Sequence, residues 1–235
     1  MQNYPLTCVS GYWKCKNKHS NKYEDEWFQN TLKLQCPYVF FGDKKGIEII
    51  KLFRGNFITH YIEMEISDFY SSRYKDLMIT DDWHCPSVEL NLIWNEKIFL
   101  IERATSLNPF KSEFFAWADA GLCTYREYKP APIMFPNKNR LNILPCDKFI
   151  YSASEEYEEH RVDEPNWHHI SGSAYIIHKN FVAPFTFIYK TYMDRLINKE
   201  RIWTDQVIWT HIYRDHKNLF HKIGWDYGQL FLHLH

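Results

Sequence analysis

Short runs of large apolar residues alternate along this chain with longer segments whose apolar residues recur at helical spacing. The runs that predict strands are residues 6–13, 38–42, 114–121, 143–153 and 170–179. The segments that predict helices are residues 23–34, 87–104 and 184–198, with a last helix that begins after Thr204. Strands separated by helices of this length favour a mostly parallel α/β sheet with helices on both faces. Residues 46–53 and 59–66 are expected to be β or mixed segments.

Two of the predicted helices are defined by a continuous apolar face. In the helix 87–104 this face is made by Leu90, Ile93, Trp94, Ile98 and Ile101. In the helix 184–198 it is made by Phe185, Ile188, Tyr189, Tyr192, Met193, Leu196 and Ile197. Apolar residues three and four positions apart are typical of a helix with one buried side. Thr204 suits the N-cap of the last helix, where Asp205 lies at the positive end of the helix dipole.

Residues 154–169, "SEEYEEHRVDEPNWHH", have no such period and are dense in charge. They are therefore predicted to form a mobile surface loop. A loop of this kind suits a lid that becomes ordered over a bound ligand.

Length and charge limit the classes of protein to consider. With 235 residues the chain is long enough for one large domain or two small ones. It has 28 basic and 29 acidic residues, so nothing favours electrostatic capture of nucleic acid or of an anionic membrane. No run approaches the roughly 20 apolar residues of a transmembrane helix. The first residues also lack the basic and apolar regions of a signal peptide.

The cysteines indicate a reducing compartment. There are six, and no two of them have C-x-x-C spacing, so we expect reduced and mostly buried thiols. A pair between Cys8 and Cys15 stays open as an alternative. Together with the charge and the lack of a transmembrane segment, this pattern predicts a cytoplasmic protein with no nucleic-acid partner.

The segment "FFAWADAG" places one carboxylate, Asp119, at the end of an apolar run. In open α/β sheets, ligands bind outside the carboxyl ends of the strands. Asp119 is therefore a candidate ligand of a divalent metal ion or a contact of a nucleotide diphosphate, and Gly121 would let a phosphate approach closely. The alternative is that Asp119 only caps the next turn, as aspartates at strand ends often do.

Two further residues bear on this choice. Asp43 follows the apolar run 38–42, where it suits either a ribose contact or an ordinary turn. Lys97 lies on the apolar face of the helix 87–104, so its amine either reaches past the rim of the core or points into the site toward a phosphate.

Aromatic residues make up 18% of the chain. Their rings either pack in the core or wall a site that stacks bases and sugar faces.

The order of these segments resembles the HtrL/YibB-like proteins, a poorly characterised bacterial family. The segments are "TCVSGYW", "YVFFGD", a helix with Lys97, "NPFKSEFFAWADAG", "SGSAYII" and "TDQVIW". The most specific part is the block from Asn108 to Gly121, which is close to the family pattern N-P-F…W-x-D-x-G. The family in turn resembles the GT-A glycosyltransferases. That resemblance implies a single Rossmann-like domain with a nucleotide-binding half, about 1–121, and an acceptor half, about 122–235.

The resemblance also implies roles for individual residues. Asp119 would stand at the metal-binding acidic motif, and Asp205 would lie beside the reacting sugar as the catalytic residue. The donor-binding residues would be Thr7, Val9, Ser10 and Gly11 near the base, Asp43 near the ribose, Lys97 and Gly121 near the phosphates, and Gly172 and Ser173 beneath the sugar or acceptor. The metal would be Mn²⁺ or Mg²⁺. The donor would be a nucleotide sugar, UDP-linked by family analogy alone. The acceptor would be a hydroxyl of a glycan, a lipid-linked sugar or a protein.

One departure from the pattern matters for the metal. Many such enzymes have two acids, D-x-D, whereas here the third position is Gly121. Either His233 or His235 in the terminal "FLHLH" supplies a further ligand, or the tail is simply frayed. A third possibility is that no metal is required.

Other common sites are not indicated. His160, His168 and His169 do not have the spacing of a zinc site, and the chain has no P-loop, dinucleotide-binding or hydrolase-elbow motif. Two hypotheses remain. One is a nucleotide-sugar glycosyltransferase, and the other is a glycan- or nucleotide-binding module whose active site has degenerated.

Overall fold

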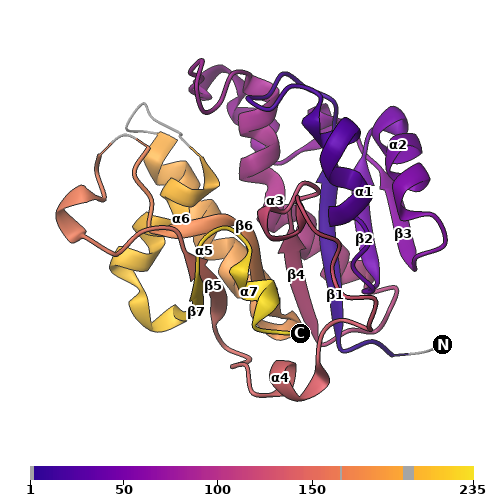
Figure 1. Ribbon diagram of the computed structural model, residues 1–235. Coiled ribbons are helices and arrows are strands. Elements are labelled where there is room, and N and C mark those ends of the chain that lie inside the picture. The colour runs from indigo at the N-terminus through magenta and orange to yellow at the C-terminus, as the bar shows by residue number, and fades with distance from the viewer. Residues whose placement is uncertain (1–2, 165, 198–203) are drawn as a thin grey trace.

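The computed structural model describes residues 3–164, 166–197 and 204–235, and a single sheet runs through them (Figure 1). Its strands are β1 (Leu6–Tyr12), β2 (Tyr38–Gly42), β3 (Thr59–Glu63), β4 (Phe114–Ala118), β5 (Phe149–Ala153), β6 (Ile170–His178) and β7 (Phe220–Trp225). The spatial order is β3-β2-β1-β4-β6-β5-β7.

All strands except β6 run in the same direction. β1 is parallel to β2 and β4, β2 is parallel to β3, and β5 is parallel to β7. β6 is antiparallel to both of its neighbours, β4 and β5. The prediction of a mostly parallel α/β sheet is therefore confirmed. Because β6 is reversed, it begins at the edge of the sheet where β1 and β4 end.

Helices cover both faces of the sheet (Figure 1). They are α1 (Phe28–Thr31), α2 (Lys44–Arg54), α3 (Val88–Leu107), α4 (Lys138–Asn142), α5 (Lys179–Ile197), α6 (Asp205–Asp215) and α7 (Gln229–Leu232). Apolar side chains of α3, α5 and α6 share one core with the sheet, and those of α1, α2 and α7 share the other. The chain thus forms one α/β domain of three layers.

The strands serve both cores because their side chains alternate between the two faces. In β4, Phe115 and Trp117 belong to the core beneath α3, whereas Phe114 and Ala116 belong to the opposite core. All five residues of this strand are buried. The uninterrupted apolar runs in the sequence are therefore what a central strand with two covered faces requires.

The segment 46–53 is a helix, so its assignment as β or mixed was wrong. The carboxylate of Asp43 accepts a hydrogen bond of 2.6 Å from the backbone N–H of Gly46 and caps the start of α2. Ile47 and Ile50, three positions apart, turn toward the core. The helix ends at Gly55, whose φ of 56° is readily available to glycine. In the sequence, Ile49 stands directly before Ile50, and this pair makes the three-residue spacing from Ile47 to Ile50 hard to recognise.

Other boundaries also differ from the prediction. The helix expected at 23–34 is a π-helical turn, Tyr23–Trp27, followed by the four residues of α1. Of the strand expected at 143–153, only 149–153 is extended. The helix expected at 184–198 begins at residue 179, and residue 198 lies outside the described residues. Thr204 is the N-cap of α6 as predicted, although its side chain makes no capping hydrogen bond.

Residues 154–169 connect β5 to β6, and the described part of this segment has one short 3₁₀ turn, Glu159–Arg161, as its regular structure. Val162 and Trp167 are nevertheless buried, so this loop packs against the protein in part. Its closure over a ligand stays a prediction.

All six cysteines are free. Cys8, Cys36 and Cys85 are buried, Cys15 is half-buried, and Cys123 and Cys146 are exposed. The alternative pair between Cys8 and Cys15 is therefore not formed. Among the described residues, no helix combines the length and the apolar character needed to cross a bilayer.

We predict that Asp43→Ala lowers the free energy of unfolding by about 0.5–2 kcal/mol, because it removes the N-cap of α2. Asp43→Ser should recover most of the loss, since serine also caps helices. Urea denaturation of the three proteins measures the effect. Equal stability of the parent and the alanine variant would show that the cap contributes nothing, and a loss of nucleotide affinity in both variants would support the ribose contact instead.

Candidate active site

A cluster of three charged side chains, two of them buried, lies at the edge where β1 and β4 end. Asp119 directly follows β4, Asp205 is the first residue of α6, and Lys97 comes from the middle of α3. The Lys97 ammonium nitrogen lies 3.1 Å from Asp119 Oδ1 and 3.3 Å from Asp205 Oδ2. Hydrogen bonding between Asp119 N–H and Ser173 O, at 2.9 Å, brings the start of β6 to the same place. Residues far apart in the sequence thus meet at the ligand-binding edge of the sheet.

The amine of Lys97 is fully engaged by the protein. Besides the two carboxylates, it donates a hydrogen bond of 2.8 Å to the carbonyl oxygen of Gly172. The side chain is 4% exposed. Burial alone would lower the pKa of Lys97, but Asp119 and Asp205 outweigh burial and raise the pKa above its usual value. Lys97 therefore points inward rather than past the rim, where it pairs with two carboxylates and donates a hydrogen bond to a carbonyl. Its contact with a phosphate stays a prediction.

Asp119 presents one oxygen to the protein and the other to the solvent side. Its Oδ1 accepts a hydrogen bond of 2.7 Å from Trp117 Nε1 in addition to the contact with Lys97. The side chain is 33% exposed. Among the described residues, no backbone N–H of the following turn donates to this carboxylate, so the structure does not support the capping alternative. Its contact with a ligand stays a prediction.

Asp205 is the most deeply placed acid of the cluster. Burial raises its pKa, Lys97 opposes the rise and the nearby charge of Asp119 adds to it, and together they place the pKa at about 6. Its Oδ2 accepts no hydrogen bond, although Lys97 lies within ion-pair distance. A carboxylate with a pKa near neutrality can both accept and release a proton at physiological pH.

Gly172 makes room for this aspartate. A Cβ atom at position 172 would lie 2.9 Å from Asp205 Oδ2 and 2.7 Å from Gln206 Cγ. The first turn of α6 can therefore pack on β6 only because residue 172 has no side chain.

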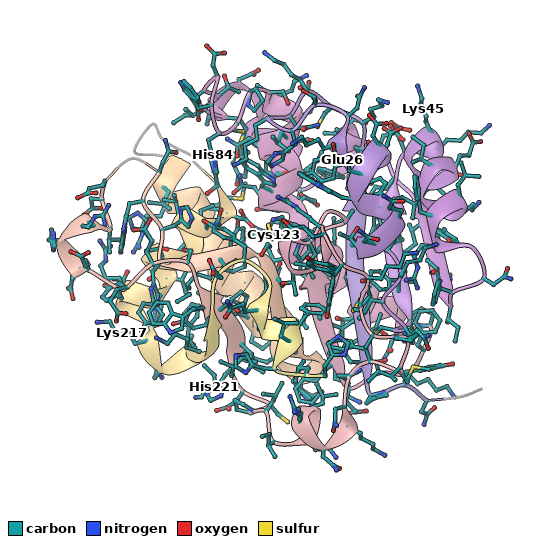
Figure 2. The ribbon with its side chains drawn as sticks, viewed as in Figure 1. Glu26, Lys45, His84, Cys123, Lys217 and His221 are labelled. Carbon is teal, nitrogen blue, oxygen red and sulfur yellow. The ribbon has the colours of Figure 1, made fainter. Side chains whose placement is uncertain are left out.

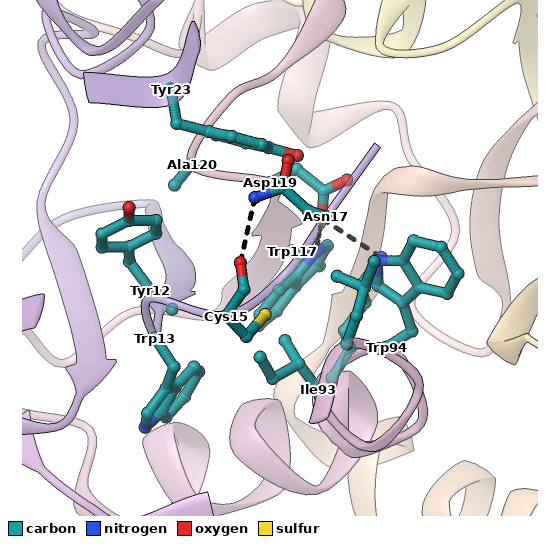
Figure 3. Close-up of a pocket in the computed structure, with 13 residues that line it drawn as sticks. Tyr12, Trp13, Cys15, Asn17, Tyr23, Ile93, Trp94, Trp117, Asp119 and Ala120 are labelled. Atoms are coloured by element: carbon teal, nitrogen blue, oxygen red, sulfur yellow. Dashed lines mark hydrogen bonds and ion pairs between the residues drawn. The ribbon is translucent and has the colours of Figure 1, made fainter. Parts of the chain in front are cut away.

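Beside the charged cluster lies a cleft whose first half is aromatic (Figure 3). This part, which we call the aromatic half, is walled by the rings of Tyr12, Trp13, Tyr23, Trp94 and Trp117. Gly11 also lines it. Figure 3 shows these rings gathered around Asp119. Flat faces of this kind stack well on planar groups such as nucleobases.

The second half of the cleft is polar. This part, which we call the polar half, is lined by Lys18, His19, His84, Arg126, Gly172, Ser173, Asp205, Gln206 and Tyr227. In Figure 2, His84 and Cys123, which also line this half, are labelled near the middle of the molecule. Tyr23, Trp94, Lys97 and Asp119 line both halves, so the two are continuous.

The two histidines of the polar half have lowered pKa values, because they are partly buried and lie near positive charges. Burial, with smaller effects of Arg126 and Lys18, lowers the pKa of His19 to about 4. Burial also lowers the pKa of His84 to about 4, with Lys18 and His168 adding to the effect. Both imidazoles are therefore neutral at pH 7, and the positive charge of this half rests on Lys18 and Arg126.

Several residues predicted near the donor base lie in the core instead. Thr7 is buried and its hydroxyl lies 2.8 Å from the hydroxyl of Ser112. Val9 and Ser10 are also completely buried within β1. Of the predicted run, only Gly11 reaches the cleft. The strand is central in the sheet, so only its last residues reach the ligand-binding edge.

The space above two glycines is filled by aromatic rings. A Cβ atom on Gly11 would lie 2.4 Å from Trp13, and one on Gly121 would lie 2.5 Å from Tyr23. The Tyr23 ring occupies the space that a side chain of Gly121 would fill, and the predicted approach of a phosphate to Gly121 stays a prediction. Asp43 caps α2 and does not line either half of the cleft.

The structure does not bring the predicted metal ligands together. His235 Nε2 lies 2.6 Å from the Tyr125 hydroxyl, and the ring of His233 packs beside Gly224. Neither histidine lines the cleft. Within the described ranges, no three His, Cys, Asp or Glu side chains are placed to share a metal ion. Because Lys97 already neutralises the carboxylate of Asp119, this donor set does not fit Mn²⁺ or Mg²⁺.

Sequence reasoning missed several residues of the cleft, among them Lys18, Tyr23, His84 and Arg126. All four lie in or beside loops, where no periodicity marks a residue as facing a site. The abundance of aromatic residues was the one signal, since it indicated that rings would wall a site as well as fill the core.

Two solved structures share this fold. The apo form of mouse xyloside xylosyltransferase 1 matches with a TM-score of 0.55 and 14% identity, over 93% of this chain and 84% of that chain. The galactosyltransferase LgtC, in complex with donor and acceptor sugar analogs, matches with a TM-score of 0.52 and 8% identity, over 92% and 72% of the two chains. A search of the curated proteins gives no match. The chain therefore has the fold of the GT-A glycosyltransferases.

The family follows from the sequence itself. The profile of the family described as "Bacterial protein of unknown function (HtrL_YibB)" matches residues 44–234, so the chain belongs to that family. The block from Asn108 to Gly121 lies within the match. β1 and β2, which carry "TCVSGYW" and "YVFFGD", lie before it.

We predict that Lys97→Met lowers the free energy of unfolding by about 3–5 kcal/mol, because it leaves the buried carboxylate of Asp205 and the partly exposed carboxylate of Asp119 without their counter-ion. Lys179→Met is the matched control, since Lys179 pairs with Glu113 at the surface, where such pairs contribute about 1 kcal/mol or less. Guanidinium denaturation measures both. If the two substitutions cost the same, the cluster does not stabilise the fold.

Proposed function

We propose that this protein transfers a sugar from a nucleotide diphosphate donor to a hydroxyl group of an acceptor. The observation that carries the proposal is the continuity of the cleft. An aromatic half suited to a base and a polar half suited to phosphates and sugars meet at the charged cluster, at the carboxyl ends of the strands. The GT-A fold supports the same reading by analogy, since both similar structures are named as glycosyltransferases.

The donor would lie along the cleft with its base among the rings of Tyr12, Tyr23 and Trp94. Its diphosphate would then pass Asp119, and its sugar would reach the floor made by Gly172 and Ser173. The free oxygen of Asp119 is placed to accept a hydrogen bond from a hydroxyl of the donor. No residue of the aromatic half selects one base over another, so UDP remains the proposal by family analogy.

Asp205 is the residue that we propose acts on the reacting sugar. In the reaction the bond between the sugar C1 and the diphosphate oxygen breaks, and its electron pair stays on the diphosphate. The acceptor oxygen forms the new bond to C1, and its proton must go to a base. A carboxylate with a pKa of about 6 is ionised at pH 7 and can take that proton. Its Oδ2 accepts no hydrogen bond from the described residues, so an incoming hydroxyl would supply one.

The first experiment is a turnover assay with a panel of nucleotide sugars, in the presence and absence of Mn²⁺, that measures released nucleotide diphosphate. Release with any donor supports the transferase. Nucleotide binding by isothermal titration without turnover, for all donors and acceptors tried, would favour a binding module instead.

We predict that Asp205→Asn lowers kcat by about 100-fold or more while nucleotide affinity changes by a few-fold at most. Asparagine keeps the size of the side chain but cannot take a proton. Asp215→Asn, at the other end of α6 and outside the cleft, is the matched control and should leave kcat unchanged. Turnover of the Asp205 variant within a few-fold of the parent would remove Asp205 from the reaction.

The same assignment predicts the pH dependence of the parent protein. Below pH 6 the carboxylate of Asp205 is protonated and cannot act as a base, so kcat should fall about tenfold per pH unit. Above pH 6 it is ionised, and kcat should level off. The residual kcat of Asp205→Asn should not fall in this way below pH 6. An equally steep fall in that variant would assign the titration to another group.

A further inference from the structure

The polar half of the cleft contains two cations that the protein itself does not neutralise. Among the ion pairs of the described residues, neither Lys18 nor Arg126 has a carboxylate partner. Lys18 is exposed, and its amine lies 3.3 Å from Nδ1 of His84. Both side chains line the cleft beside Asp119. Unpaired positive charge in a concave site attracts an anion.

Arg126 is held in a fixed orientation. Its guanidinium carbon lies 3.7 Å from the centre of the Trp27 ring, and Nε donates a hydrogen bond of 2.8 Å to the carbonyl of Gly121. Its two terminal NH₂ groups donate no hydrogen bond to any of the described residues. A guanidinium that is stacked on a ring and free at its fork is preorganised for two parallel hydrogen bonds to a phosphate.

The rest of the site explains why these two cations are needed. Lys97 is ion-paired with Asp119 and Asp205 and donates a hydrogen bond to Gly172, so its charge is already balanced within the protein. The side chains around Asp119 also do not fit a divalent cation, because Lys97 lies 3.1 Å from this single carboxylate. The negative charge of a diphosphate leaving group must therefore be balanced by other side chains.

We propose that Lys18 and Arg126 bind the diphosphate of the nucleotide donor and take the place of a divalent metal ion in its activation. This inference rests on the proposed function. As the C1–O bond breaks, negative charge develops on the diphosphate. Fixed cations stabilise that charge in a partly water-excluded cleft, as a metal ion would. The nucleotide should then bind and react without a metal.

The test is isothermal titration of the full-length protein with UDP, GDP and uridine, in excess EDTA and again with Mn²⁺. UDP or GDP should bind with affinities that agree within about threefold between the two conditions, and more tightly than uridine, which lacks the diphosphate. Donor turnover should likewise persist in EDTA.

Variants identify the side chains responsible. Lys18→Gln and Arg126→Gln should each weaken diphosphate binding about tenfold or more, the loss expected for one charge-assisted contact, while leaving uridine binding unchanged. Arg126→Lys keeps the charge but loses the fork, and should fall between the parent and Arg126→Gln. Lys22→Gln is the control, since Lys22 is close in sequence but does not line the cleft.

The outcomes separate this inference from the proposed function. Binding that is lost in EDTA and restored by Mn²⁺ would show that a metal is needed and would overturn the inference while leaving the transferase proposal intact. Binding that is independent of metal but unaffected by Lys18→Gln and Arg126→Gln would overturn the assignment of these residues. Failure of every nucleotide to bind in both conditions would overturn the proposed function and this inference with it.

Discussion

A lysine amine that has been taken out of water needs polar or charged partners, and in this protein three different segments supply them. Removing an ion from water costs several kcal/mol unless its partners are well placed. Lys97 of α3 meets that requirement through Asp119 after β4, Gly172 in β6 and Asp205 in α6. None of these segments can move alone without leaving a buried charge unpaired. The position of the cleft is thereby tied to the stability of the fold.

Close packing at this edge depends on residues that lack a side chain. Gly11 and Gly121 admit the rings of Trp13 and Tyr23, and Gly172 admits the carboxylate of Asp205. Each glycine thus positions a functional group through contact with the protein itself. A glycine in a strand-end motif is usually taken as room for a ligand. Here the room is already occupied, and the ligand would meet the aromatic rings instead.

Much of the fold was readable from the sequence because burial on two faces leaves a clear pattern. The uninterrupted apolar runs predicted β1, β2, β4 and β6, and helical spacing predicted α3. Asp119 and Asp205 were placed correctly at a strand end and a helix start, since those positions follow from the boundaries of elements. The α2 helix was missed because its apolar residues fit two periods equally well. Lys18 and Arg126 could not be found, since their meeting depends on loop paths that no local pattern encodes.

The reversed direction of β6 has a consequence for how such a site can diversify. Since β5 ends at the same edge where β6 begins, the connection 154–169 both leaves and re-enters the sheet beside the cleft. Residues can be added to such a connection without displacing either strand, and doubling its length costs only about 0.6 kcal/mol of loop-closure entropy. The charged cluster and the aromatic rings are held by elements outside this loop. Insertions and deletions in this loop would therefore reshape the rim of the cleft while the charged cluster and the aromatic rings keep their positions.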